Sequence, residues 1–187
     1  MRRLLLLAGL IVFCWSVPAA ALEIGGVQLP DTAGIGGRTL VLNGAGLRSK
    51  FFFKIYAGGL YLEQATHDAE TVINADAPML VRMQFIYDGV SAEKMQDGWK
   101  EGFAVTAPDP SDNLEVAIEA FVDFFTEEVR EGDVYEIAWI PDKGVQVAFN
   151  GTILGVVTGL DFKKALFAVW FGPHPVDDDL KEGMLGR

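Results

Sequence analysis

The longest run of alternating side chains, residues 47–63, restricts the fold more than any other part of the sequence. Positions of one parity are mostly apolar, whereas positions of the other parity begin with Arg48, Lys50 and Lys54 and then become apolar. A period of two places successive side chains on opposite faces of a sheet. The sequence therefore predicts one long strand, with the first set facing the core and the second set starting cationic and becoming apolar. A bend or a bulge is expected at residues 58–59.

The segments around this run predict an α+β fold. Further strands are expected at residues 38–42, 79–87, 134–140, 145–149 and 152–158. A turn is expected at residues 43–46, and the strongest helical stripe runs from 114 to 129. Helix starts are expected at Ser91, at Asp112 with Glu115 in a capping box, at Asp161, and at Asp177 or Asp178. Strands at the front and after residue 133, with helices between and after, favour a large antiparallel sheet with helices on one side.

Residues 1–21 have the composition of a secretory signal. Two arginines precede an apolar run over residues 4–17, and small residues follow up to Ala21. The apolar run is shorter than the about 20 residues that a spanning helix needs. We expect a signal peptide at 1–21, cleavage near Ala21, a periplasmic or secreted location, and a single domain over residues 22–187. An uncleaved anchor is the alternative, and no stable membrane span is expected after cleavage.

The charge balance excludes several partner classes. The chain has 15 basic and 26 acidic residues, and removal of Arg2 and Arg3 leaves 13 against 26, a net charge of -13. This acidity opposes binding to nucleic acid, and it weakens the case for electrostatic docking on anionic lipid. The single cysteine, Cys14, lies in the signal, so neither an intrachain disulfide nor a cysteine zinc cluster is expected.

The strand face from Arg48 to Tyr56 is the main candidate for a functional site. Generic catalytic signatures are absent, and the two histidines, His67 and His174, lie in turn-like contexts, so no metal and no cofactor are expected. The cationic face has two interpretations. It is a solvated face of an edge strand, where lysines oppose aggregation, or it lines a cleft for an anionic ligand. Arginine suits the second role because its planar guanidinium binds a carboxylate through two hydrogen bonds.

Two long motifs carry a family resemblance. Residues 46–63 read GLRSKFFFKIYAGGLYLE, and residues 168–186 read AVWFGPHPVDDDLKEGMLG. These motifs resemble the signature strand and the closing segment of the chalcone isomerase superfamily, and most of all its secreted bacterial chalcone isomerase-like branch. The resemblance spans the mature chain. It implies an open-faced β-sandwich, in which helices are layered on one face of a large antiparallel sheet.

The resemblance does not imply a single activity. The family includes enzymes that close a chalcone into a flavanone and non-catalytic members that bind fatty acids. In the enzymes an arginine stabilises the phenolate nucleophile, and a strand threonine assists through water. An ungapped alignment places that arginine near Asn43, a few residues before Arg48, and places threonines of the enzymes at Tyr56 and Val169. Residues 104–113 lack the tyrosine of the enzymes, so Arg48 alone is implied to stand in for their catalytic arginine.

Two functional hypotheses follow, from different classes of protein. In the first, a cleft between sheet and helices binds a small amphipathic or aromatic acid as carboxylate or phenolate. The ligand contacts expected in this case are Arg48, Phe52, Tyr56, Arg82, Trp99 and Trp170. In the second, the protein is an isomerase or intramolecular lyase, with Arg48 and Tyr56 as catalytic residues and the arginine stabilising an oxyanion. A periplasmic module that binds another protein is a third hypothesis, and the oligomeric state is left open.

Overall fold

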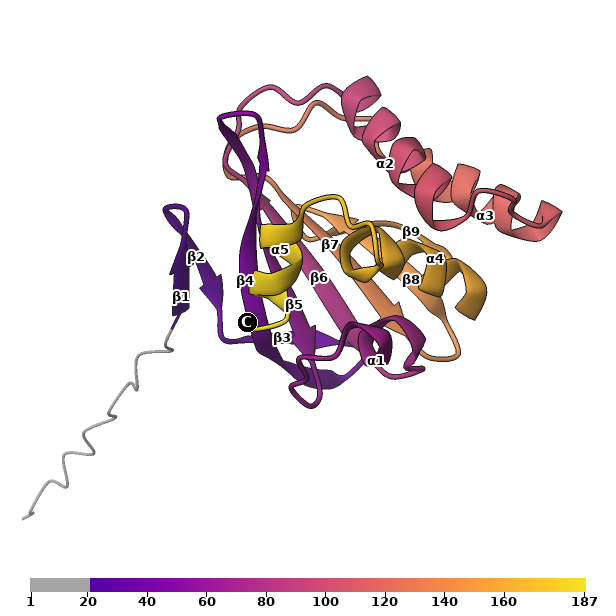
Figure 1. The fold of residues 1–187 in the computed structure, drawn as a ribbon, viewed down its shortest axis with the longest axis horizontal. Helices are drawn as coiled ribbons and strands as arrows, with labels where there is room; N and C mark the ends of the chain where they lie inside the picture. Colours follow the sequence, from indigo (N-terminus) through magenta and orange to yellow (C-terminus); the bar gives the residue numbers. More distant parts are fainter. Residues whose placement is uncertain (1–20) are drawn as a thin grey trace, which may run out of the picture.

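The computed structural model describes residues 21–187, so the expected signal peptide lies outside the described residues except for Ala21. Its centre is a curled seven-stranded sheet in which every neighbouring pair of strands is antiparallel and the strands follow one another in chain order (Figure 1). The strands of this sheet are β3 (Thr32–Ile35), β4 (Arg38–Lys50), β5 (Phe53–Leu62), β6 (Met79–Phe85), β7 (Val134–Ile140), β8 (Gly144–Phe149) and β9 (Thr152–Val157). Two further strands, β1 (Ala21–Ile24) and β2 (Val27–Pro30), form a separate hairpin.

Five helices cover one face of the sheet. They are α1 (Ala69–Asn74), α2 (Ala92–Thr106), α3 (Asp112–Val122), α4 (Leu160–Phe171) and α5 (Asp178–Met184). Each helix contributes buried side chains to one large core that also contains the strand residues facing it, and Val72, Phe103, Phe121, Leu166 and Leu180 are examples. This arrangement confirms the α+β prediction with helices on one face of a large antiparallel sheet. No helix within residues 21–187 is long and apolar enough to cross a bilayer.

The opposite face of the sheet carries a second, smaller core. Leu40, Tyr61, Leu80 and Ala138 are buried together there. The N-terminal hairpin contacts this face, because the Tyr61 hydroxyl donates a hydrogen bond to the Pro30 carbonyl oxygen at 2.9 Å. Both parities of β5 are therefore buried. The prediction placed the core on the face of Tyr61, but the larger core takes Tyr56, Leu60 and Leu62 from the other parity, because the helices cover that side.

The expected single strand at residues 47–63 is instead a hairpin. Lys50 pairs with Phe53, and Phe51 and Phe52 form the two-residue turn between β4 and β5. This turn lacks the Asn-Gly or Gly-rich signal that usually marks such a connection. The period-two pattern of the sequence therefore continues across the turn without interruption. Consequently Arg48 and Tyr56 are cross-strand partners on adjacent strands, and they share a face for this reason.

The expected turn at residues 43–46 is the interior of β4. A register irregularity between Leu42 and Gly44 leaves Asn43 outside the pairing with β5. The Asn43 side chain donates to the carbonyl oxygens of Thr66 (3.0 Å) and Met184 (2.9 Å). The glycines that follow admit α5 instead of turning the chain, because a Cβ at Gly46 would lie 2.5 Å from the Leu180 carbonyl oxygen. No bulge interrupts β5 at residues 58–59, since both glycines pair in register with β4 and β6.

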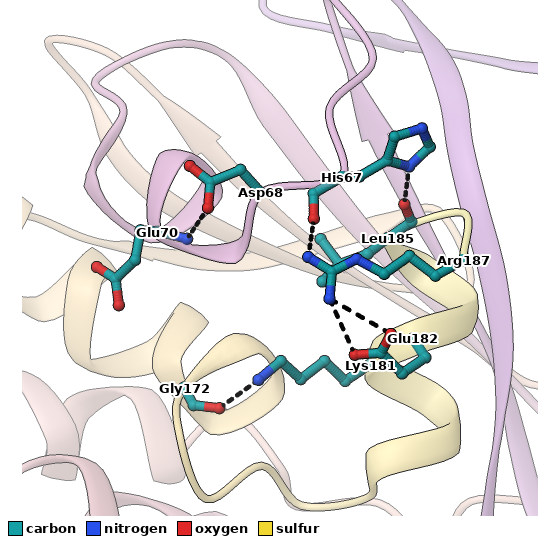
Figure 2. Close-up of polar contacts among 8 residues, drawn as sticks. All are labelled: His67, Asp68, Glu70, Gly172, Lys181, Glu182, Leu185 and Arg187. Atoms are coloured by element: carbon teal, nitrogen blue, oxygen red, sulfur yellow. Dashed lines mark hydrogen bonds and ion pairs between the residues drawn. The ribbon is translucent and has the colours of Figure 1, made fainter.

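The C-terminal segment is tied to the rest of the molecule by polar contacts (Figure 2). The His67 ring Nδ1 lies 2.6 Å from the Leu185 carbonyl oxygen, and Arg187 donates to the His67 carbonyl oxygen. Lys181 donates to the Gly172 carbonyl oxygen at 2.8 Å, which joins α5 to the end of α4. These bonds hold α5 over β4 and also fix the link between α4 and α5.

Side-chain caps explain where most helices begin. Ser91 and Asp177 accept from backbone N–H groups of α2 and α5, as the sequence predicted. The cap of α3 is Ser111, one residue before the expected Asp112, because its extended backbone aims the hydroxyl at the N–H of Leu114. The first helical residue of α4 follows Gly159, whose φ of 112° suits glycine, so Asp161 is not its cap. The stripe expected to reach residue 129 ends as helix at Val122.

Candidate functional site

A cavity of about 380 Å³ lies between the helix-bearing face of the sheet and the helices. Its floor is formed by β4, β5 and β6 through Arg48, Tyr56 and Met83. Its other walls come from α2, the end of α4, the loop before α2 and the link before α5. The apolar lining includes Tyr87, Val90, Met95, Val169 and Val176. Mostly apolar walls with a few polar groups, and a volume of this size, are typical of a small-molecule site.

Arg48 and Tyr56 are brought together on the cavity floor. They are directly paired in the β4–β5 register, and the Arg48 guanidinium carbon lies 5.8 Å from the centre of the Tyr56 ring. Arg48 is half-buried, and no carboxylate within residues 21–187 forms an ion pair with it. A partly desolvated cation without an acidic partner is well placed to pair with an anion that enters the cavity.

The Tyr56 hydroxyl is held as a neutral donor. Tyr56 is 1% exposed, and its oxygen accepts a hydrogen bond of 3.1 Å from the indole Nε1 of Trp170. Burial raises the pKa of Tyr56, and the opposing influences of Arg48 and the Trp170 hydrogen bond are smaller. The phenol therefore keeps its proton at neutral pH. Within the described part of the chain that proton has no acceptor, so the hydroxyl is available to a ligand oxygen.

Trp99 has a second unused donor. It lines the cavity from α2, and its ring packs edge-on against Trp170 at 5.4 Å between centroids. Its indole Nε1 is buried and has no hydrogen-bond partner among residues 21–187. A buried N–H without a partner is costly, and protein atoms cover this one, so Trp99 contributes its ring to the cavity wall.

The mouth of the cavity carries charges of both signs. Lys50 and Lys94 line it together with Asp97 and Glu101, and all four are exposed. Arg48 is the cation nearer the floor. Opposite charges at an exposed rim contribute little to binding energy. Arg48 is therefore the charge that can stabilise an anionic ligand in the cavity.

Two of the six expected ligand contacts lie away from the cavity. Phe52 is 99% exposed at the tip of the β4–β5 hairpin, because the chain turns there. Arg82 is on the other face of the sheet, since its neighbour Met83 faces the cavity, and it pairs with Glu136 at 2.5 Å. The other four, Arg48, Tyr56, Trp99 and Trp170, all line the cavity.

The sequence analysis missed part of the cavity wall. Met95 belongs to the helical stripe that includes Trp99, so its place in the wall could have been inferred from that spacing. Phe53, Tyr87 and Val176 have no comparable signal, because they reach the cavity from the first position of β5, a loop and an interhelical link. Within residues 21–187 no group of three or more His, Cys, Asp or Glu side chains is arranged to hold a metal ion.

Comparison with known proteins identifies the class of fold and then the family. The fold is similar to that of a fatty-acid binding protein from Arabidopsis thaliana, with a TM-score of 0.74 and 18% sequence identity, over 89% of this chain and 96% of that one. A sequence profile of the chalcone isomerase-like family matches residues 21–186, so the chain belongs to that family. No functionally curated protein matches the sequence significantly. The recognised family and its fold are thereby confirmed.

Proposed function

We propose that this protein binds a small amphipathic acid in the cavity, with an anionic oxygen at Arg48 and Tyr56. The observation that carries the proposal is the Tyr56 hydroxyl, which accepts from Trp170 and has its own proton unused beside the Arg48 guanidinium. A carboxylate or phenolate oxygen accepts from both groups. The walls of Met83, Met95 and Val169 suit an alkyl or aromatic remainder.

The likeness to the Arabidopsis fatty-acid binding protein supports this class of ligand. Further support comes from the hydrogen-bond donors that the site leaves without an acceptor. Arg48 and Tyr56 are both donors, and donors without acceptors favour a ligand with oxygen lone pairs. A periplasmic or extracellular location is part of the proposal and is supported by the composition of residues 1–21.

The test is a thermal-shift and calorimetric comparison of straight-chain fatty acids and aromatic acids with their methyl esters. We expect the acids to bind wild type and the esters to bind more weakly. Arg48→Gln should weaken acid binding about tenfold or more, and Tyr56→Phe by a smaller factor, because hydrogen bonds to a charged group are worth about 1.5–3 kcal/mol. Arg38→Gln is the matched control on the same strand, since Arg38 is exposed and pairs with Glu63.

Equal acid binding by wild type and Arg48→Gln would contradict the proposal. The same preparations also test the isomerase hypothesis, which the placement of Arg48 on the cavity floor supports. Chalcone cyclisation is followed by absorbance. A rate in wild type that is lost in Arg48→Gln, without acid binding, would replace the binding function by an isomerase.

A further inference from the structure

The turn between β4 and β5 presents three consecutive phenylalanines to solvent. Phe51, Phe52 and Phe53, here called the aromatic tip, are 86%, 99% and 56% exposed. Figure 1 shows this turn at one end of the sheet. Exposed apolar residues are normally scattered singly, and a contiguous exposed group of large apolar side chains marks an interaction surface. Only Phe53 of the three has an aromatic neighbour, Tyr87, at 5.4 Å between ring centres.

The backbone of the tip shows that folding alone does not explain these residues. Phe51 has a φ of 57°, in the left-handed region that bulky side chains rarely adopt. A two-residue hairpin turn with a positive φ at its first central position ordinarily carries glycine there. The chain instead holds a strained and exposed aromatic ring, so the composition of the tip needs another cause.

The hairpin that carries the tip is cationic, although the molecule as a whole is acidic. The β4–β5 hairpin, residues 38–62, carries four of the 13 cations of the mature chain and none of its 26 acidic residues. Lys50 and Lys54 flank the aromatic tip directly and are exposed. Within the described part of the chain neither lysine forms an ion pair. Acidic residues lie on neighbouring segments at this end of the sheet, among them Asp97 and Glu101, so the cationic character belongs to the hairpin itself.

We propose that the aromatic tip docks this protein on a lipid bilayer that contains anionic phospholipid. Phenylalanine rings enter the boundary between headgroups and acyl chains, and the flanking lysines extend to the phosphates. An exposed turn also suits a bilayer better than a protein partner. A bilayer needs no complementary groove, whereas a stable protein interface buries about 800 Å² on each side.

The tip is continuous with the cavity described above. Lys50, Phe51 and Phe53 line the cavity mouth, so docking through the tip turns that mouth toward the bilayer. If the ligand is an amphipathic acid, docking then lets it pass between bilayer and cavity with little exposure to water. This consequence rests on the proposed function, but the docking itself does not.

The full chain is expressed, and the protein purified after processing is sedimented with vesicles. The vesicles contain phosphatidylcholine alone or phosphatidylcholine mixed with phosphatidylglycerol. We expect binding to the mixed vesicles that weakens as salt is raised. Phe52→Ser should lower the partition coefficient about tenfold, and Lys54→Gln about fivefold. Neither residue lines the cavity. Matched controls are Ile153→Ser, which is 59% exposed on β9, and Lys143→Gln in another hairpin turn, and both should bind as wild type does.

A second measurement places the tip in the bilayer directly. The protein used is the processed one without residues 1–21, so Trp15 is removed, and the remaining Trp99, Trp139 and Trp170 are buried. In Phe52→Trp the fluorescence accessible to brominated lipid therefore comes from the tip. Quenching of this variant, with little quenching of wild type, is the expected result. Absence of quenching overturns the proposal, as does equal vesicle binding by wild type and Phe52→Ser. Self-association that Phe52→Ser abolishes, without vesicle binding, overturns it in favour of a second copy of this chain.

The two proposals fail separately. Phe52→Ser should keep the acid affinity of wild type in the absence of vesicles, because its side chain lies outside the cavity. Arg48→Gln should lose acid binding and still show quenching when combined with Phe52→Trp. Loss of acid binding in both variants would indicate damage to the fold, and circular dichroism of each variant checks this.

Discussion

Tyr56 shows how a single residue acquires a function from its neighbours. A surface tyrosine donates and accepts hydrogen bonds with water. In Tyr56 the hydroxyl oxygen instead accepts from the Trp170 indole, and burial keeps the hydroxyl protonated. Lys163 is the opposite case, a charged group used for structure. It is fully buried on α4, and its Nζ donates to the carbonyl oxygens of Val72, Ile73 and Ala75, each at 2.8 Å. It thereby provides hydrogen-bond donors for carbonyl oxygens that have no partner within the helix at the C-terminal end of α1.

The buried lysine predicts an unusual dependence of stability on pH. Burial lowers the pKa of Lys163 to about 8, against 10.5 when exposed, with Asp76 opposing the shift. Between these values the unfolded chain binds more protons, so the free energy of unfolding rises with pH. Burial also raises the pKa of Tyr61 and Tyr135 to about 12, which reverses the trend above pH 10.

We therefore expect maximal stability near pH 10, with a rise of about 2–3 kcal/mol from pH 8. Urea unfolding at intervals of half a pH unit measures this curve. Lys163→Met should remove the rise and keep the fall above pH 10, whereas the adjacent Lys164→Met should keep both. A wild-type curve that declines steadily from pH 8 would show that Lys163 does not titrate in this range.

Elements of this fold are joined by close backbone approaches as well as by side chains. The glycines of β4 and β5 allow α5 to lie directly on the strands, and its polar contacts hold it there (Figure 2). The same helix begins at Asp177, whose carboxylate also accepts from the backbone N–H of Ser49, next to Arg48. The position of α5 is therefore coupled to the cavity floor.

Gly46→Ala tests this coupling between elements. Its Cβ would lie 2.5 Å from the Leu180 carbonyl oxygen and 2.7 Å from the Leu180 Cα, so α5 must move. We expect a loss of about 1–3 kcal/mol of stability and weaker acid binding. Gly34→Ala on β3 is the matched control, because nothing lies within 4 Å of its added Cβ. Similar unfolding curves for the two variants would show that α5 tolerates displacement without cost.

The whole molecule has a marked asymmetry of charge. Its acidic residues are distributed over the domain except for the β4–β5 hairpin, which carries only cations. A net charge far from zero keeps a protein soluble and dispersed, while a local patch of the opposite sign directs it to one kind of partner. The molecule thus presents one hairpin that differs from the rest in both charge and hydrophobicity.

Processing of the N-terminus is a property of the full chain. If residues 1–21 are a signal peptide, the protein purified from the periplasm of a bacterial host lacks them, and intact-mass spectrometry shows the loss. Ala21→Leu should accumulate the precursor, because signal peptidase requires small residues at the cleavage site. Ala8→Leu, within the apolar run, is the control and should be processed normally. A mass that retains residue 1 in wild type would indicate an anchor.

Much of the fold could be predicted because its signals are local. Period-two alternation located β6, β7 and β8, and caps at Ser91 and Asp177 located two helix starts. The β4–β5 hairpin could not be predicted in this way, since Phe51 and Phe52 preserve the alternation and neither is a usual turn residue. The segment that begins at Asn43 was wrongly predicted as a turn. Its glycines lie inside β4, where they allow α5 to pack closely against the strand.

By itself the sequence determined the class of fold, the family motifs, the acidic balance, and the pairing of Arg48 with aromatic residues as a candidate site. Each of these depends on residue types and short spacings, which the chain carries before it folds. Tertiary structure alone decided that Tyr56 meets Trp170, that Arg82 faces the other side, and that Phe52 lies at an exposed tip. Contacts between distant segments depend on strand register and on the position of the turn, and a shift of one residue moves every side chain to the opposite face.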